Sequence, residues 1–106
     1  MKIQLLHTAD CHAWKNALKE LEGAVKELKI KNKIEVMEIK TQEEAEKYKF
    51  SASPTIKINN IDIDPIGRKI TKFSVMSCRL YFYKGKVYDF PPKEMIIEGI
   101  RELEKK

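Results

Sequence analysis

The chain has 106 residues, a length typical of one domain built around one hydrophobic core. Hydrophobic residues make up 42% of it and charged residues 35%, which is typical of a soluble globular protein. No apolar run approaches the roughly 18–20 residues that a membrane span requires, so we expect no membrane partner. Residues 1–7 are too short and too quickly polar for a signal peptide, and we therefore expect a cytoplasmic protein.

The net charge is +5, and a basic chain can bind nucleic acid. The lysines, however, are interspersed with glutamates, as in residues 15–22 and 40–49, and the arginines are not clustered with aromatic residues. We therefore expect no nucleic-acid partner. A surface rich in lysine and glutamate is also typical of proteins from thermophiles.

The first half of the chain predicts two successive βα units. Residues 2–7 predict a central strand, and apolar residues then recur at helical spacing over about 13–30. Asn32 and the lysines around it fit the C-terminal end of this helix, where cations and a left-handed residue are favoured. The next elements follow in the same order: a strand over 34–39, a capping box formed by Thr41 and Glu44, and a short helix to about Lys49.

The second half predicts a hairpin, an irregular stretch and a final helix. Asn59 and Asn60 tolerate the positive φ of a type I′ turn between two short strands. The expected elements are strands over 55–58 and 61–63, an irregular lid or excursion over 66–77, strands over 79–83 and 87–88, and a helix opened by Pro91 and Pro92. This order predicts one α/β domain over 1–106, with a mixed sheet and helices on both faces.

Cys11 stands between the first strand and the first helix. The unpaired amides and the dipole at a helix N-terminus stabilise a thiolate, and the adjacent His12 adds to this effect. The pattern favours a reactive thiol, and the alternative is a small buried residue that ends a loop. A C-x-x-C motif would need a cysteine at position 14, where this chain has Trp14, a residue more typical of a core or a cleft wall.

Ser53 and Pro54 open the strand over 55–58. A peptide bond before proline is the place where a cis peptide occurs, and a cis bond here would turn the Ser53 backbone outward toward a bound peptide or thiol. Local sequence alone favours a trans bond, but the order of the surrounding elements favours cis. We therefore treat Ser53, Pro54, His12 and Trp14 as candidate substrate-binding residues.

Cys78 is the only other cysteine. The predicted hairpin returns the chain to the edge of the sheet where Cys11 lies, and Cys78 opens a strand that leaves this same edge. Cys78 could therefore approach Cys11 as a resolving thiol or a second ligand, provided that the Cα atoms come within about 7 Å. The alternative is a buried packing cysteine. Asp62 and Asp64 are expected to be solvated, and Tyr81, Phe82 and Tyr83 to pack within the sheet.

The two cysteines, with His7 and His12, also form a possible set of ligands for a soft metal such as zinc or copper(I). No C-x-x-C or H-x-x-x-H spacing supports a closed metal site, so we expect neither a bound metal nor a cofactor.

The order of elements around Cys11 and the Ser53-Pro54-Thr55-Ile56 segment resembles the thioredoxin/glutaredoxin superfamily. More narrowly, Cys78 before an Arg-Leu-Tyr strand and the helix led by two prolines resemble small thioredoxin-like proteins annotated near alkylmercury-lyase genes. The resemblance spans most of the chain. It implies that Cys11 is the attacking thiol, Pro54 a cis-proline and Cys78 the second thiol, whereas Trp14 departs from the usual redox motif.

These observations leave three hypotheses. The first is thiol–disulfide exchange on a thiol or disulfide substrate, for example a protein, with Cys11 as nucleophile and Cys78 as resolving thiol. The second is a module that binds a soft metal or an organomercurial through both thiols. The third is a non-catalytic thioredoxin-like interaction domain. The sequence does not name the oligomeric state.

Overall fold

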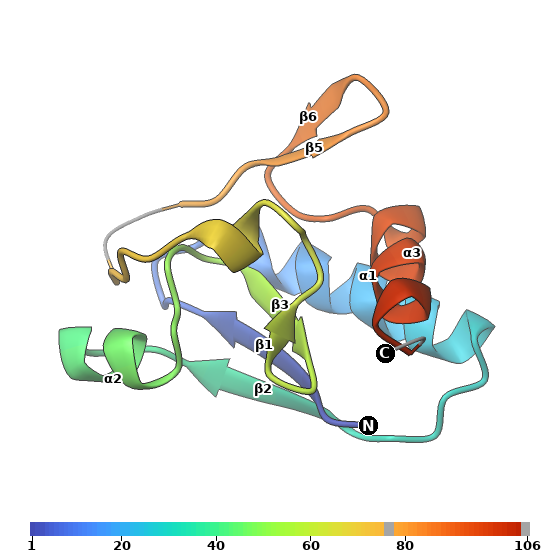
Figure 1. Cartoon of the computed structure of the whole chain (residues 1–106), viewed down its shortest axis with the longest axis horizontal. Coiled ribbons are helices and arrows are strands. Elements are labelled where there is room, and N and C mark those ends of the chain that lie inside the picture. Colours follow the sequence, from blue (N-terminus) through green and yellow to red (C-terminus); the bar gives the residue numbers. More distant parts are fainter. Residues whose placement is uncertain (76–77, 105–106) are drawn as a thin grey trace.

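The computed structural model describes residues 1–75 and 78–104. Its main sheet has four strands in the order β2-β1-β3-β4, in which β1 pairs parallel with β2 and antiparallel with β3. The bounds of these strands are β1 Ile3–His7, β2 Ile34–Glu38, β3 Thr55–Ile58 and β4 Ile61–Asp62. The protein therefore belongs to the α/β class and has a mixed sheet, as the sequence predicts (Figure 1).

Strand β1 lies inside the sheet, and all five of its residues are buried. Successive side chains of a strand point to opposite faces. Ile3 and Leu5 accordingly lie in one apolar cluster and Leu6 in another. The prediction of a central strand buried on both faces is confirmed.

Helices α1 (Trp14–Glu27) and α3 (Lys93–Glu104) cover one face of the sheet and lie side by side (Figure 1). The inner face of α3 is buried, as predicted. The end of α1 differs from the prediction, because the left-handed residue there is Lys29, with φ of 57°, and not Asn32. Asn32 instead donates its side-chain amide to the carbonyl of Met1, a contact that a local pattern cannot predict.

Helix α2 (Gln42–Lys47) belongs to the apolar cluster on the other face. The predicted capping box is present: the Thr41 hydroxyl accepts from the Glu44 amide, and the Glu44 carboxylate accepts from the Thr41 amide. Ala45 and Phe50 pack there against Leu6. Helices thus lie on both faces of the sheet.

The hairpin between β3 and β4 turns at Asn59 and Asn60, whose φ values are 52° and 69°. This confirms the predicted turn with two left-handed residues. Strand β4 is only two residues long. Pro65, three residues after its end, lacks a backbone N–H. The chain then forms a single 3-10 turn, η1 (Gly67–Lys69), within the stretch expected to be irregular.

The predicted strand over 79–83 is present in shorter form, over Tyr81–Tyr83, and does not join the main sheet. Strand β5 (Tyr81–Tyr83) pairs only with β6 (Lys86–Tyr88), and the two form a separate ribbon that stands away from the main sheet (Figure 1). Because β4 is short and Pro65 follows it, the main sheet offers little edge for another strand. The lid hypothesis for 66–77 extends over residues 76–77, which lie outside the described residues.

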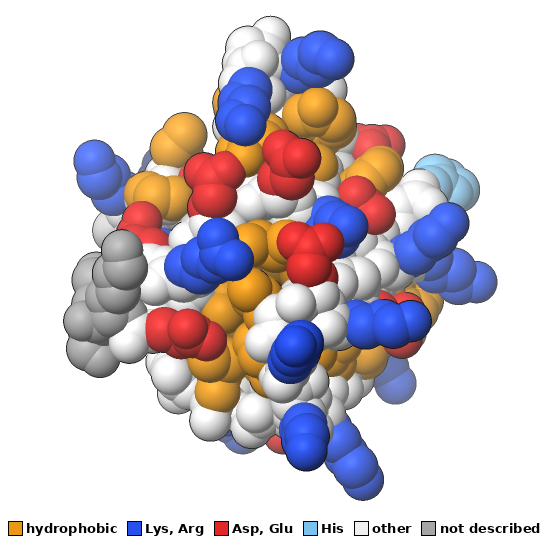
Figure 2. All heavy atoms as spheres, turned by 90° about the vertical axis from the view of Figure 1, so that its right-hand side faces the viewer, with side chains coloured by type: hydrophobic (Ala, Val, Ile, Leu, Met, Phe, Trp, Pro, Cys, Tyr) orange, Lys and Arg blue, Asp and Glu red, His pale blue; other side chains and the backbone are white. Residues whose placement is uncertain are grey.

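Both basic and acidic side chains surround apolar atoms on the face shown in Figure 2, with basic side chains more frequent toward its lower right. This mixture agrees with the interspersed lysines and glutamates of the sequence. Among the described residues, no helix is long and apolar enough to cross a membrane.

Candidate functional site: two thiols at the cis-proline turn

Cys11 lies in the turn that leads from β1 to α1. Its amide donates to the carbonyl of Thr8 at 3.3 Å, and α1 begins three residues later, with Ala13 as the N-cap residue. Only 7% of Cys11 is exposed, so the thiol lies in the wall of the site and not on an open helix end. The sequence thus placed Cys11 in the correct connection, and its burial agrees with the alternative of a small buried residue that ends a loop.

The peptide bond between Ser53 and Pro54 is cis, as the order of elements predicted. Ser53 is almost completely buried, and its hydroxyl accepts a hydrogen bond from the Thr8 amide at 3.1 Å. Thr8 in turn accepts from the amide of Cys11. The proline turn is therefore tied directly to the loop that carries the thiol.

Cys78 reaches the same place by backbone pairing. It forms an isolated parallel bridge with Ser53, and the next residue, Arg79, donates its amide to the Ser53 carbonyl at 2.8 Å. Both cysteines are free thiols, Cys11 buried and Cys78 exposed. A cavity of about 190 Å³ is lined by Cys11, Cys78 and Ser53, together with His12 and others.

The exposure of Cys78 argues against the alternative of a buried packing cysteine. The pairing also corrects one expectation about Ser53. Its carbonyl does not face an open groove, because the chain's own Arg79 already occupies it.

A buried cluster of charges holds the segment after Cys78. The Arg79 guanidinium donates to both carboxylate oxygens of Asp62, at 2.6 and 2.9 Å, and lies 3.4 Å from a carboxylate oxygen of Asp64. It also donates to the Thr55 hydroxyl at 3.1 Å. The expectation that Asp62 and Asp64 are solvated was wrong, since both are more than nine-tenths buried.

The charge state of this cluster follows from its contacts. Burial by itself disfavours the charged guanidinium, but Tyr81 and the carboxylates of Asp62 and Asp64 together outweigh this effect and raise the pKa of Arg79 above its ordinary value. Arg79 is therefore a fixed positive charge that joins β4 and the following turn to the segment carrying Cys78. Unlike a surface pair, such a cluster is sensitive to the loss of one partner.

Tyr81 completes the support of the proline turn. Its hydroxyl donates to the Pro54 carbonyl at 2.5 Å, and the Arg79 guanidinium lies 4.6 Å from the centre of its ring. Burial, reinforced by nearby acidic groups that include Cys11, raises the pKa of Tyr81 and keeps the hydroxyl protonated as a donor. Tyr81 is buried as expected, whereas Phe82, also expected to pack within the sheet, is 60% exposed.

The remaining predicted residues divide between the cavity and the core. His12 is exposed and lines the cavity with the thiols. Trp14 instead stacks on the buried His7, with ring centres 3.8 Å apart, and packs against the core. Within the described part of the chain, no three His, Cys, Asp or Glu side chains gather as metal ligands.

Sequence reasoning missed the roles of Arg79, Asp62, Asp64 and Thr8. An Asp-x-Asp pair after a hairpin and a lone arginine after a cysteine are visible in the sequence, but 15 residues separate Asp64 from Arg79. Only the fold shows that these charges meet.

Comparisons with curated proteins and with solved structures find no match to this chain. One family model matches residues 1–100, which is nearly the whole chain. The chain therefore belongs to the family described as a domain of unknown function, DUF2703.

Proposed function

We propose that this protein is thioredoxin-like and performs thiol–disulfide exchange, with Cys11 as the nucleophile and Cys78 as the resolving thiol. The observation that carries the proposal is that both free thiols line one small cavity at a cis-proline turn. The order of elements, a βαβ unit followed by an antiparallel hairpin and a final helix, supports this proposal.

The two thiols of the protein supply both electrons that reduce the substrate disulfide. The Cys11 thiolate attacks one sulfur of a substrate disulfide, forms a mixed disulfide with it and releases the other substrate sulfur as a thiolate. The Cys78 thiolate then attacks the Cys11 sulfur, and the second substrate thiolate leaves. The substrate gains two electrons, and the protein is left with a disulfide between Cys11 and Cys78.

Position 14 is tryptophan, so a resolving thiol has to come from another part of the chain. A nearby thiol must replace the missing cysteine of a C-x-x-C motif, and Cys78 is brought to the same cavity from a distant part of the chain. Arg79, the residue after Cys78, supports this arrangement because it is held at two points. Its amide donates to Ser53, and its guanidinium donates to Asp62.

The first test is to equilibrate the protein in a graded glutathione redox buffer and to map the thiols by alkylation and mass spectrometry. We expect an intramolecular disulfide between Cys11 and Cys78, with a potential of roughly −120 to −270 mV. Cys78→Ser should trap a mixed disulfide on Cys11, and Cys11→Ser should abolish reduction of a model disulfide. Activity that survives in Cys11→Ser would overturn the proposal.

The same experiment separates the other two hypotheses. If both thiols remain free in every buffer while one Cu⁺ binds per chain and requires both cysteines, a soft-metal module is favoured. If the thiols remain free and bind no metal, an interaction domain is favoured.

A further inference from the structure

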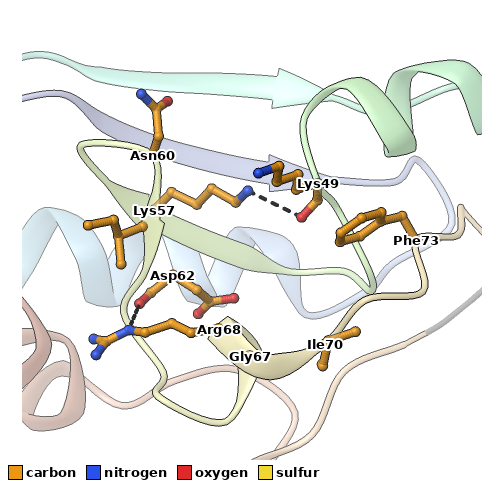
Figure 3. A pocket seen from close by; sticks show the side chains of 9 residues that line it. Lys49, Lys57, Asn60, Asp62, Gly67, Arg68, Ile70 and Phe73 are labelled. Carbon is orange, nitrogen blue, oxygen red and sulfur yellow. Dashed lines mark hydrogen bonds between the residues drawn. The ribbon is translucent and has the colours of Figure 1, made fainter.

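A second cavity, of about 230 Å³, lies between β3, β4 and η1, away from the thiols (Figure 3). Its wall contains the side chains of three basic residues, Lys49, Lys57 and Arg68. Ile61, Ile70 and Phe73 provide apolar surface. The only acidic residue among those that line it is Asp62.

Lys57 is the unusual member of this cavity, because only 7% of it is exposed. Its ammonium group donates to the carbonyls of Tyr48 and Lys49, at 2.6 and 3.2 Å, where α2 ends (Figure 3). These bonds complete the end of the helix, but the acceptors are neutral and use two of the three N–H groups. Within residues 1–75 and 78–104, no carboxylate forms an ion pair with Lys57.

The charges around Lys57 are not balanced. Burial lowers the pKa of Lys57, Asp62 opposes this effect, and the positive charges of Lys49 and Arg79 lower the pKa further. Both oxygens of Asp62 are already engaged by Arg79. Arg68 is likewise committed, since it pairs with Glu102. Among the described residues, Lys49 and Lys57 are therefore two like charges at one cavity that form no ion pair with a carboxylate.

We propose that this cavity binds the phosphate group of a small phosphate monoester, with the ammonium groups of Lys57 and Lys49 as its ligands. Two adjacent cations favour a doubly charged oxyanion, because a hydrogen bond from a charged donor to a charged acceptor is stronger than one between neutral groups. Asn60 also lines the cavity, and the apolar surface of Ile70 and Phe73 would contact the organic part of the ligand. The proposal does not depend on the thiol chemistry.

The test is an NMR titration of the ¹⁵N-labelled protein with phenyl phosphate, inorganic phosphate or acetate. Sodium chloride keeps the ionic strength equal in all three titrations. We expect saturable shifts at Lys49, Lys57 and Asn60, with phenyl phosphate binding more tightly than phosphate and phosphate more tightly than acetate. Shifts that are spread over the whole surface, or that are the same for acetate, would overturn the proposal. Equal binding of phenyl phosphate and inorganic phosphate would overturn the role of the apolar wall.

Two matched pairs of variants locate the site. Lys49→Gln should weaken phenyl phosphate binding by about tenfold, as expected for one charge-assisted hydrogen bond, whereas Lys86→Gln on β6 removes the same charge and should leave it unchanged. Asn60→Asp places a negative charge at the cavity and should weaken binding more than Asn59→Asp does. Equal effects within either pair would overturn the proposed location.

Lys57→Gln tests the buried ligand directly, but this variant also loses the cap on α2. Its circular dichroism spectrum establishes whether it folds. A folded Lys57→Gln that binds phenyl phosphate like the unmodified protein would overturn the proposal, and the variants of Lys49 and Asn60 decide the question if it does not fold.

Discussion

The two segments that carry the cysteines are held in place by different forces. The segment of Cys11 follows β1, whose five residues are all buried within the apolar clusters of the sheet. The segment of Cys78 alternates exposed residues, Leu80 at 56% and Phe82 at 60%, with the buried Tyr81, and its Arg79 is held among buried carboxylates. Apolar burial thus fixes one thiol and a cluster of charges fixes the other.

This difference shows how one cavity can combine a rigid wall with a wall that depends on electrostatics. Apolar packing tolerates changes of similar volume. A buried charge cluster responds strongly to the loss of one member, because the remaining charges stay buried without a partner. The position of Cys78 should therefore be the more sensitive of the two to single substitutions.

The largest expected effect is that of Arg79→Met. This change leaves Asp62 and Asp64 buried without their cation, and we expect the free energy of unfolding to fall by about 3–5 kcal/mol. Disulfide formation between Cys11 and Cys78 should also become slower. Urea unfolding and alkylation kinetics measure the two effects, with the exposed Arg101→Met as a control; a loss below about 1 kcal/mol would show that the cluster does not hold this segment.

Leu5→Ala tests the other side of the comparison. Leu5 is fully buried in the centre of the sheet, and truncation should cost about 2–5 kcal/mol of unfolding free energy. In the folded protein, the rate of disulfide formation should nevertheless stay close to that of the unmodified protein. A rate as low as that of Arg79→Met would break the distinction between the two segments.

Gly67→Ala should disturb the charge cluster by steric collision, without removing a charge. A Cβ at Gly67 would collide with the Arg79 guanidinium and the Asp62 carboxylate, so we expect a loss of about 1–3 kcal/mol in urea unfolding. Gly23→Ala is the control, since its Cβ would meet only the flexible side chain of Lys93, at 3.2 Å. Within α1 this change should stabilise the protein by up to about 1 kcal/mol, and equal losses at both sites would contradict the steric explanation.

The smallest expected effect is a dependence on pH that Lys57 contributes. Burial lowers the pKa of Lys57 below the value of 10.5 that applies to the unfolded chain. Between these two values the unfolded chain binds more protons, so stability should rise with pH and level off above 10.5. The difference in unfolding free energy between the unmodified protein and Lys57→Met should rise through this window; a flat difference would show that the folded pKa is not lowered.

The sequence predicted those features whose causes are local. The capping box of α2 depends on Thr41 and Glu44, which are three residues apart, and the hairpin depends on two asparagines that accept positive φ. The central position of β1 followed from its continuous apolar character. In each case the residues that decide the structure are neighbours in the chain.

Only the tertiary structure decided the features that depend on distant partners. Asp62 and Arg79 are 17 residues apart, and each alone resembles a solvated charge. The burial of Cys11, the separate ribbon of β5 and β6, and the approach of Lys49 to the buried Lys57 likewise depend on how segments pack. Local propensity acts through neighbours in the sequence, whereas burial and electrostatic pairing depend on neighbours in space.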